Sequence, residues 1–201
     1  MSNANSNDSV PSHSESNDED RQAKIRYTKM QAAEIQLVTA LRLFFEDVDP
    51  RPVETLCGAV LGILHPLGEK HGITGMLNDP EMIPPGLEKL WFRRLNEVPN
   101  FLKHADKDWD STMEYDTAAL PFRLFEAVAL FDRIDARVFK ARKKKRFAVV
   151  YNFWFGITYP HLVKKGATEW TGWLKEVADR LPPNAGKGFF LDLLVNQAPT
   201  S

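Results

Sequence analysis

The sequence predicts an all-α protein, an antiparallel bundle of about five to seven helices that follows a disordered N-terminal tail. Apolar side chains recur at steps of three and four through several long segments, and strand signals are sparse. Proline and glycine separate these segments. Hydrophobic residues make up 43% of the 201 residues and aromatic residues 11%, which is enough for a sizeable core.

Seven segments carry the helical pattern, over residues 29–46, 52–65, 87–105, 117–134, 136–157, 167–181 and 188–196. Asp49-Pro50 is expected to end the first segment. Pro66 is expected to kink or end the second helix, and Gly72 closes that segment. Residues 73–86 are dense in proline and glycine, which predicts a loop. Residues 147–151 are rich in β-formers, but they lie inside a longer helical pattern.

The first 20 residues contain five acidic side chains and no Lys or Arg, and only Met1, Ala4 and Val10 are apolar. Such a segment cannot bury enough apolar surface to offset its ordering entropy, so we expect residues 1–25 to form a disordered acidic tail. The other 181 residues carry 26 basic and 22 acidic side chains, a net charge of +4. We expect residues 26–201 to form a single domain, with a core bundle over 29–135 and a helical extension over 136–197.

Several protein classes are excluded by what the chain lacks. Its single cysteine, Cys57, rules out a disulfide framework and a multi-cysteine metal site, and its apolar neighbours predict a buried, inert thiol. The sequence contains no 18-residue apolar run, no export signal and no phosphate-binding loop. We therefore expect a cytoplasmic protein with no cofactor and no membrane partner.

A polar stripe on the third segment is the most informative local pattern. Arg93, Glu97, Asn100 and His104 follow i, i+4, i+7, i+11 spacing and so share one side of a helix. They form either a functional site, with His104, Asn100 and Arg93 as its candidate catalytic residues, or an ordinary surface. In the second case Glu97 pairs with Arg93, and His104 stabilises a helix end. A dimer-forming face is a third interpretation.

Pro99 interrupts this stripe. It cannot donate to the carbonyl of Leu95, so we expect either a kinked helix with that carbonyl free or two shorter helices that meet at Pro99. Arg94 falls at the edge of the apolar stripe, and we expect it to reach a carboxylate on another element, Glu114 or Asp116.

Residues 96–106, NEVPNFLKHAD, resemble the N-F-x-K-H-A-D signature of a poorly characterised bacterial protein family, over roughly residues 34–133. The Asn100-x-x-x-His104 core more distantly resembles the helical HEPN superfamily. That resemblance implies a dimer in a stress or defence system and a ribonuclease motif of arginine, a polar residue and histidine. The position of the motif's arginine is Pro99 here, so the chain can keep the fold without the cleavage chemistry.

The acidic segment after the stripe resembles the start of a calcium loop, with Asp106, Asp108 and Asp110 at alternate positions. Ser111 and Thr117 then stand where such a loop needs Gly and Glu, which argues against calcium. A second interpretation of this segment is a divalent metal ion bound by His104, Asp106 and Asp108. A solvated loop that ends a helix is favoured, and we predict no metal site.

The densest charge run precedes an aromatic segment and contains the candidate nucleic-acid-binding residues Lys140, Arg142, Lys143, Lys144, Lys145 and Arg146. One interpretation is a solvated helix start beside a buried aromatic helix. A second is a grip on RNA or DNA phosphates. A third is a membrane-surface helix, which requires the aromatic side chains to be exposed.

Two functions from different classes follow. The first is a HEPN-like protein that binds or processes RNA or another polyanion. The second is a non-enzymatic helical interaction module that assembles as a homodimer. The basic run favours the first, and the missing arginine favours the second.

Overall fold

The computed structural model describes residues 25–79, 85–104, 109–162, 179–181 and 186–196, and these residues contain helices and no strands. The α-helices are α1 (Lys29–Phe45), α2 (Pro50–Glu69), α3 (Glu88–Phe101), α4 (Leu120–Arg137), α5 (Arg146–Thr158) and α7 (Lys187–Val195). Three short 3-10 helices lie at Met76–Asn78, Thr117–Ala119 and Pro160–Leu162. The all-α prediction is confirmed. The predicted helix over 167–181 lies outside the described residues except for its last three, and the predicted tail lies outside them except for Ile25.

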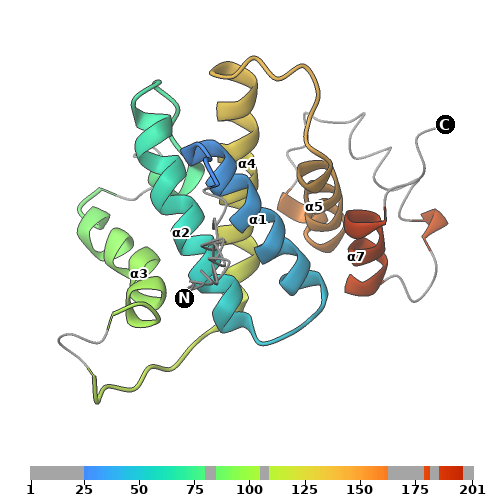
Figure 1. Cartoon of the computed structure of the whole chain (residues 1–201). Helices are drawn as coiled ribbons and strands as arrows, with labels where there is room; N and C mark the ends of the chain where they lie inside the picture. Colours follow the sequence, from blue (N-terminus) through green and yellow to red (C-terminus); the bar gives the residue numbers. More distant parts are fainter. Residues whose placement is uncertain (1–24, 80–84, 105–108, 163–178, 182–185, 197–201) are drawn as a thin grey trace, which may run out of the picture.

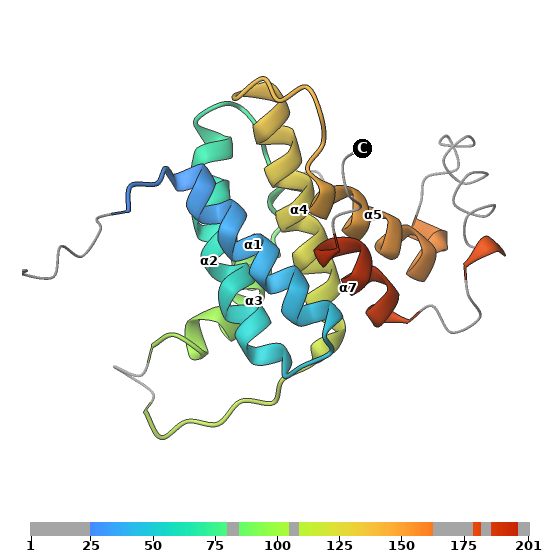
Figure 2. The ribbon, with the colours of Figure 1, turned by 45° about the vertical axis from the view of Figure 1, so that its right-hand side comes forward.

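The central helices are α1, α2 and α4 (Figure 1). Helix α3 lies on the outer side of α2, whereas α5 and α7 lie on the opposite side of the molecule, against α4 and α1. Figure 2 shows the same order from a second direction. The helical segments predicted after residue 135 thus contribute α5 and α7 to the same core as α1 and α4.

Local sequence explains where the first two helices begin. Thr28 and Gln31 form a capping box at α1, in which each side chain accepts a hydrogen bond from the other residue's backbone N–H. Asp49 caps α2 by accepting from the N–H of Arg51 at 2.9 Å, and Pro50 occupies the first turn.

Of the two outcomes predicted at Pro66, a kink or the end of the helix, the end is wrong, because α2 continues through Pro66 to Glu69. Pro66 deprives the carbonyl of Gly62 of its helical donor, but Gly62 is exposed, so water can replace that donor. The buried face of α2 continues past the proline, with Leu64 and Gly68 both buried. Tertiary packing therefore outweighs the local break.

Helices α2 and α4 pack together and run in the same direction. Glu54 on α2 pairs with Arg123 near the start of α4, and Gly68 near the end of α2 lies beside Leu130 and Ile134. Consecutive helices such as α1 and α2 run in opposite directions (Figure 1). The C-terminal ends of α2 and α4 consequently lie at the same end of the bundle.

Aromatic side chains fill the core between α1, α5 and α7. Phe44, Phe45, Tyr151, Trp154 and Phe190 contact one another with ring centres 4.9–6.0 Å apart. The hydroxyl of the fully buried Tyr151 donates to the carbonyl of Pro121 at 2.7 Å. Because the aromatic residues of α5 are mostly buried, the interpretation as a membrane-surface helix is wrong. None of the described helices is long and apolar enough to cross a membrane.

The fifth helix begins later than predicted. We expected a helix from residue 136, but α4 continues to Arg137 and α5 starts only at Arg146. Lys140 adopts a left-handed conformation with φ of 58°, and the carbonyl of Asp135 accepts the N–H of Ala141. Like charges one turn apart disfavour a helix, so the basic run forms the loop between α4 and α5.

Candidate functional site

Of the predicted catalytic residues, Arg93 and Asn100 lie on the exposed surface of α3, and His104 lies three residues beyond its end at Phe101. Arg93, Asn100 and His104 are all exposed, and none of them lines the two cavities described below. Asn100 is in the last turn of α3, and the backbone N–H of His104 donates to its carbonyl at 3.0 Å. Asn100 and His104 therefore lie at one helix end, and Arg93 lies about two turns away.

Arg94 pairs with neither Glu114 nor Asp116, so that prediction is wrong. Its Nη1 lies 3.0 Å from Oε2 of Glu97 on the same helix, which also replaces the predicted pairing of Glu97 with Arg93. Both side chains are largely exposed, at 70% and 42%. Solvent screens such a pair, which contributes at most about 1 kcal/mol to stability.

Helix α3 continues through Pro99, which is its one buried residue. A Cβ atom added to Gly58 on α2 would lie 2.7 Å from Cβ of Pro99, so the glycine permits the close approach of the two helices. The carbonyl of Leu95, which loses its helical donor at Pro99, accepts a hydrogen bond from Nη1 of Arg123. An arginine on α4 thus stabilises a broken helical bond on α3.

Arg123 belongs to a buried group that we call the polar seam, made of Glu54, Tyr115 and Arg123. Arg123 and Glu54 are only 6% and 1% exposed, and Nε lies 3.0 Å from Oε2 without the alignment of a hydrogen bond. The hydroxyl of Tyr115 donates to Oε1 of Glu54 at 3.1 Å. Burial raises the pKa of Glu54, and the nearby Arg123 and Tyr115 partly offset the increase. The ion pair of Glu54 and Arg123 thus connects α2 to α4 inside an apolar core.

The buried position predicted for Cys57 is confirmed. The thiol is fully buried, and burial raises its pKa to about 12. A neutral thiol without access to solvent is not a nucleophile.

A second buried carboxylate, Glu126, lies further along α4. Its Oε1 is 3.4 Å from Nε2 of His65 on α2, and its Oε2 accepts the backbone N–H of Met76 at 2.9 Å. A Cβ atom at Gly75 would lie 1.8 Å from Oε1 of Glu126, so only glycine at position 75 allows the backbone to come this close to the carboxylate. Glu126 is 1% exposed and the His65 side chain 23%, which leaves the imidazole as the accessible member of the pair.

A cavity of about 280 Å³ lies between α2, α3 and the start of α4, and we call it the His65 pocket. The polar residues that line it are His65, Asn78, Asn96, Lys103 and Arg123. No carboxylate is among its lining residues, because Glu54 and Glu126 lie behind Arg123 and His65 in the core. The sequence interpretation missed this group. Arg123 and Glu126 did leave a signal, since both are charged and fall at helical spacing within the apolar pattern of the fourth segment.

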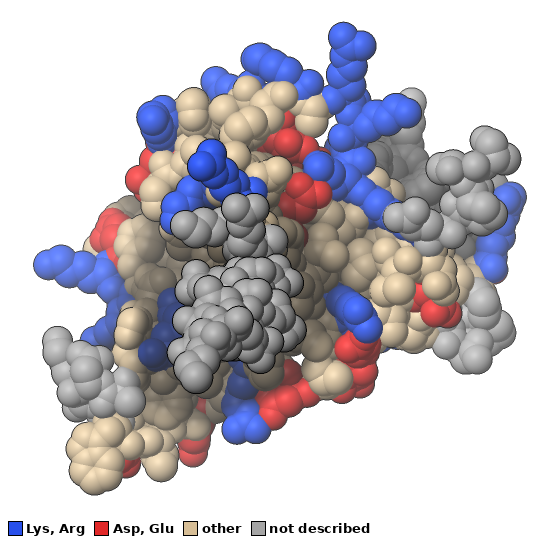
Figure 3. All heavy atoms as spheres, viewed as in Figure 1, with Lys and Arg blue, Asp and Glu red and all other residues tan. Residues whose placement is uncertain are grey.

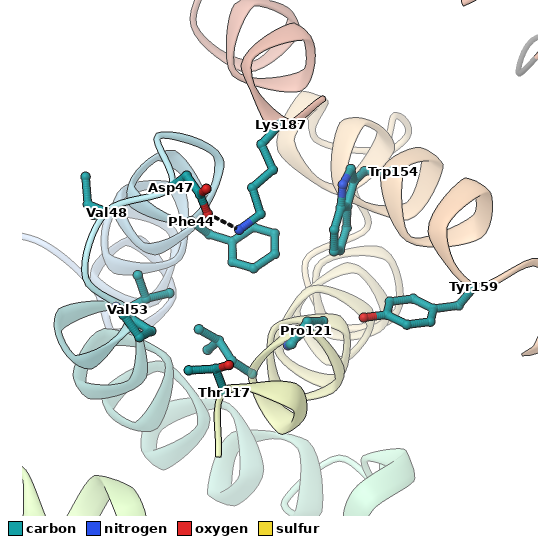
Figure 4. Close-up of a pocket in the computed structure, with 11 residues that line it drawn as sticks. Phe44, Asp47, Val48, Val53, Thr117, Pro121, Trp154, Tyr159 and Lys187 are labelled. Carbon is teal, nitrogen blue, oxygen red and sulfur yellow. Dashed lines mark hydrogen bonds and ion pairs between the residues drawn. The ribbon is translucent and has the colours of Figure 1, made fainter. Parts of the chain in front are cut away.

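A larger cavity of about 480 Å³ lies where α1, α4, α5 and α7 meet, and we call it the Lys187 pocket (Figure 4). The Lys187 ammonium lies 2.6 Å from Oδ1 of Asp47 and 4.2 Å from the centre of the Phe44 ring. Trp154 and Tyr159 face the same space. Asp47 holds a left-handed conformation, with φ of 56°. The charge of Lys187 is thus neutralised within the protein.

Basic side chains gather at the end of the bundle where α2 and α4 terminate. Figure 3 shows Lys and Arg side chains there, above α4 and the loop that follows it. We define the basic end by its exposed members Lys70, Arg137, Lys140, Arg142, Lys143 and Lys144. Lys70 and Arg137 also offset the negative ends of the two helix dipoles.

The six candidate nucleic-acid-binding residues separate into two groups. Lys144 pairs with Asp132 at 3.1 Å, Lys145 pairs with Glu34 at 2.9 Å, and Arg146 donates to the carbonyls of Leu193 and Asn196 at the end of α7. Lys140, Arg142 and Lys143 are exposed and form no ion pair with the described part of the chain. The first group fixes the loop, and the second is open to solvent.

Within the described residues, no group of three or more His, Cys, Asp or Glu side chains is arranged to hold a metal ion. Asp106 and Asp108 of the predicted acidic segment lie outside those residues. Comparisons of the chain with protein-family models, with curated proteins and with solved structures find no match. The resemblance to the HEPN superfamily therefore remains a prediction.

Proposed function

We propose that this protein binds RNA, or another polyanion, through phosphate contacts at the basic end. The observation that carries the proposal is the loop between α4 and α5, where Lys140, Arg142 and Lys143 are exposed without a carboxylate partner in the described structure. Such cations bind phosphate groups with release of counterions, independently of base sequence. The nearby carboxylates Glu69, Asp132 and Asp135 restrict this surface, and Asp132 already pairs with Lys144.

The fixed half of the basic run supports the proposal. Lys145 and Arg146 connect the loop to α1 and to the end of α7, through contacts of 2.9 Å to Glu34 and 2.6 Å to Leu193. These contacts fix the end of the loop that leads into α5, and a loop that is partly fixed loses less conformational entropy when it binds a ligand. Three exposed cations on an anchored loop are a better phosphate-binding surface than the same cations on a free one.

The test is fluorescence anisotropy with a labelled single-stranded RNA at low salt. The double variant Arg142→Gln/Lys143→Gln removes two charges from the basic end and no ion pair to a described residue. Its charge-matched control is Arg51→Gln/Lys89→Gln, with Arg51 beside Asp49 at the opposite end of α2 and Lys89 on α3. We expect the basic-end variant to bind about tenfold or more weakly and the control to stay close to wild type. Equal losses in both variants would refute a localised site.

Processing of the bound RNA is a second candidate, with Asn100 and His104 as its groups. Their exposure at the end of α3 leaves both side chains accessible to a large substrate. An imidazole beside a scissile phosphate acts as a general acid or base, but the chemistry also needs a cation near the phosphate. Arg93 is the candidate for that role. Cleavage of RNA by wild type and its loss in His104→Ala would support this activity, and equal cleavage by both proteins would exclude it.

The alternative without catalysis is a homodimeric interaction module. Leu87 and Leu90, at the start of α3, are 47% and 42% exposed and lie three residues apart, on one side of the helix, which favours burial against a second copy of the chain. Light scattering coupled to size-exclusion chromatography decides the matter. A dimer that becomes a monomer in Leu90→Lys supports this module, and a monomeric wild-type protein excludes it.

A further inference from the structure

The His65 pocket combines an apolar floor with several hydrogen-bond donors. Leu61 on α2 and Phe92, Leu95 and Pro99 on α3 line it. Its volume of about 280 Å³ is near the lower limit of the 300–1,000 Å³ that small-molecule sites occupy. A cavity of this size and composition suits a small, partly apolar molecule.

Polar groups on the pocket wall are chiefly donors. Arg123 and Lys103 can only donate hydrogen bonds, and the amides of Asn78 and Asn96 each offer two N–H groups. The amide of Asn96 already donates to the carbonyl of Phe92 within α3 at 2.8 Å, and Nη1 of Arg123 donates to Leu95. Nε of Arg123 lies 3.0 Å from Oε2 of Glu54 in the core, so Lys103 and Asn78 are the main donors on the wall for a ligand. A ligand with oxygen acceptors complements this wall.

Lys103 is the group of the pocket that suits an anionic ligand. The two buried carboxylates already have partners in the core, since Glu54 lies 3.0 Å from Arg123 and Glu126 lies 3.4 Å from His65. Lys103 is exposed at the pocket and forms no ion pair with a described residue. One ammonium group suits a ligand with one carboxylate.

From these observations we propose that the His65 pocket binds a small apolar carboxylic acid, with its carboxylate toward Lys103 and its apolar part against Phe92 and Pro99. This site is separate from the basic end and does not depend on RNA binding.

Gly62 offers a way to fill the pocket without disturbing its polar groups. It lines the cavity, and a Cβ atom added there meets no atom within 4 Å. Gly62→Leu therefore adds an apolar side chain at the wall of the pocket, whereas Gly62→Ala adds only a methyl group there. The two variants differ in occupied volume and in no charge, so they form a matched pair.

The experiment is calorimetric titration of the full chain with benzoate at constant ionic strength, with phenyl phosphate and benzyl alcohol as comparisons. We expect benzoate to bind wild type and Gly62→Ala with a dissociation constant of about 1 mM or lower, and Gly62→Leu to bind it at least about tenfold more weakly. We expect Lys103→Met to weaken benzoate about tenfold while benzyl alcohol stays unchanged. Thermal melting of each variant verifies that it is folded.

Three results would overturn the proposal. The first is absence of benzoate binding to wild type. The second is equal affinity of Gly62→Leu and Gly62→Ala, which would place the carboxylate elsewhere on the surface. The third is tighter binding of phenyl phosphate than of benzoate, which would assign the pocket to phosphorylated ligands instead.

Discussion

Replacing Arg123 with methionine should destabilise the protein by about 3–5 kcal/mol, because it removes one partner of a buried ion pair. Glu54 is 1% exposed and, among the described residues, would keep only the hydroxyl of Tyr115 as a partner. The carbonyl of Leu95 would also lose its donor, and a buried carbonyl without one costs about 1–3 kcal/mol. Because both effects come from the loss of one side chain, they are not additive, and the expected total loss of stability stays at about 3–5 kcal/mol.

Chemical unfolding in urea measures this loss. Arg93→Met is the matched control, because Arg93 is exposed and its replacement should change stability by no more than about 0.5 kcal/mol. Glu54→Met/Arg123→Met, which removes both charges, should be more stable than Arg123→Met alone. A loss below about 1 kcal/mol in Arg123→Met would refute the claim that this arginine holds α2, α3 and α4 together.

The same variant has a predicted pH dependence. Burial raises the pKa of Glu54 in the folded protein, so between its ordinary pKa and the folded-state pKa the native protein holds a proton that the unfolded chain has lost. Stability should therefore fall as pH rises through this window. The charge of Arg123 is the largest influence that lowers the pKa of Glu54, so in Arg123→Met the fall in stability should extend to higher pH. Glu54→Gln has no carboxyl group at this position and should not show this fall. A stability of Arg123→Met that rises with pH through the window would contradict this reasoning.

Gly62→Ala should raise the free energy of unfolding by up to about 1 kcal/mol, measured as a higher melting temperature, because its Cβ enters open space within a helix. Gly58→Ala should lower the melting temperature, because its Cβ would lie 2.7 Å from Cβ of Pro99. A stabilised Gly58→Ala variant would show that α3 moves freely away from α2. Cys57 should react with a thiol reagent only as fast as the protein unfolds, since it is fully buried, so rapid modification of the native state would contradict the described core. Lys187→Met should cost about 1 kcal/mol or less, and less still in 1 M salt, because its ion pair is partly exposed; a loss unaffected by salt would assign the effect to packing.

The sequence predicted helices where periodicity and capping agree. Apolar steps of three and four located α1, α4 and α7 to within a few residues. It failed at Pro66 and at residue 136, where tertiary context decides. The apolar face of α2 carries that helix past its proline, and a left-handed Lys140 ends the helical pattern before α5.

The functional surfaces were predicted in part. Exposed polar residues such as Arg93 and His104 can be recognised from helical spacing, but their exposure alone does not bring them together in a cavity. The buried charges of Glu54 and Glu126 meet partners far away in the chain, since Arg123 is 69 residues from Glu54 and Glu126 is 61 residues from His65. A sequence shows that a charge falls within an apolar stripe, and only the packing of α2 against α4 shows which charge it meets.

The salt dependence of RNA affinity tests the proposed function most directly. For single-stranded nucleic acid the slope of log affinity against log salt concentration is about −0.7 for each phosphate neutralised. We predict that Arg142→Gln/Lys143→Gln reduces the magnitude of the slope by about 1.4, while Arg51→Gln/Lys89→Gln leaves it unchanged. A slope that is the same in wild type and in both variants would contradict phosphate binding at the basic end.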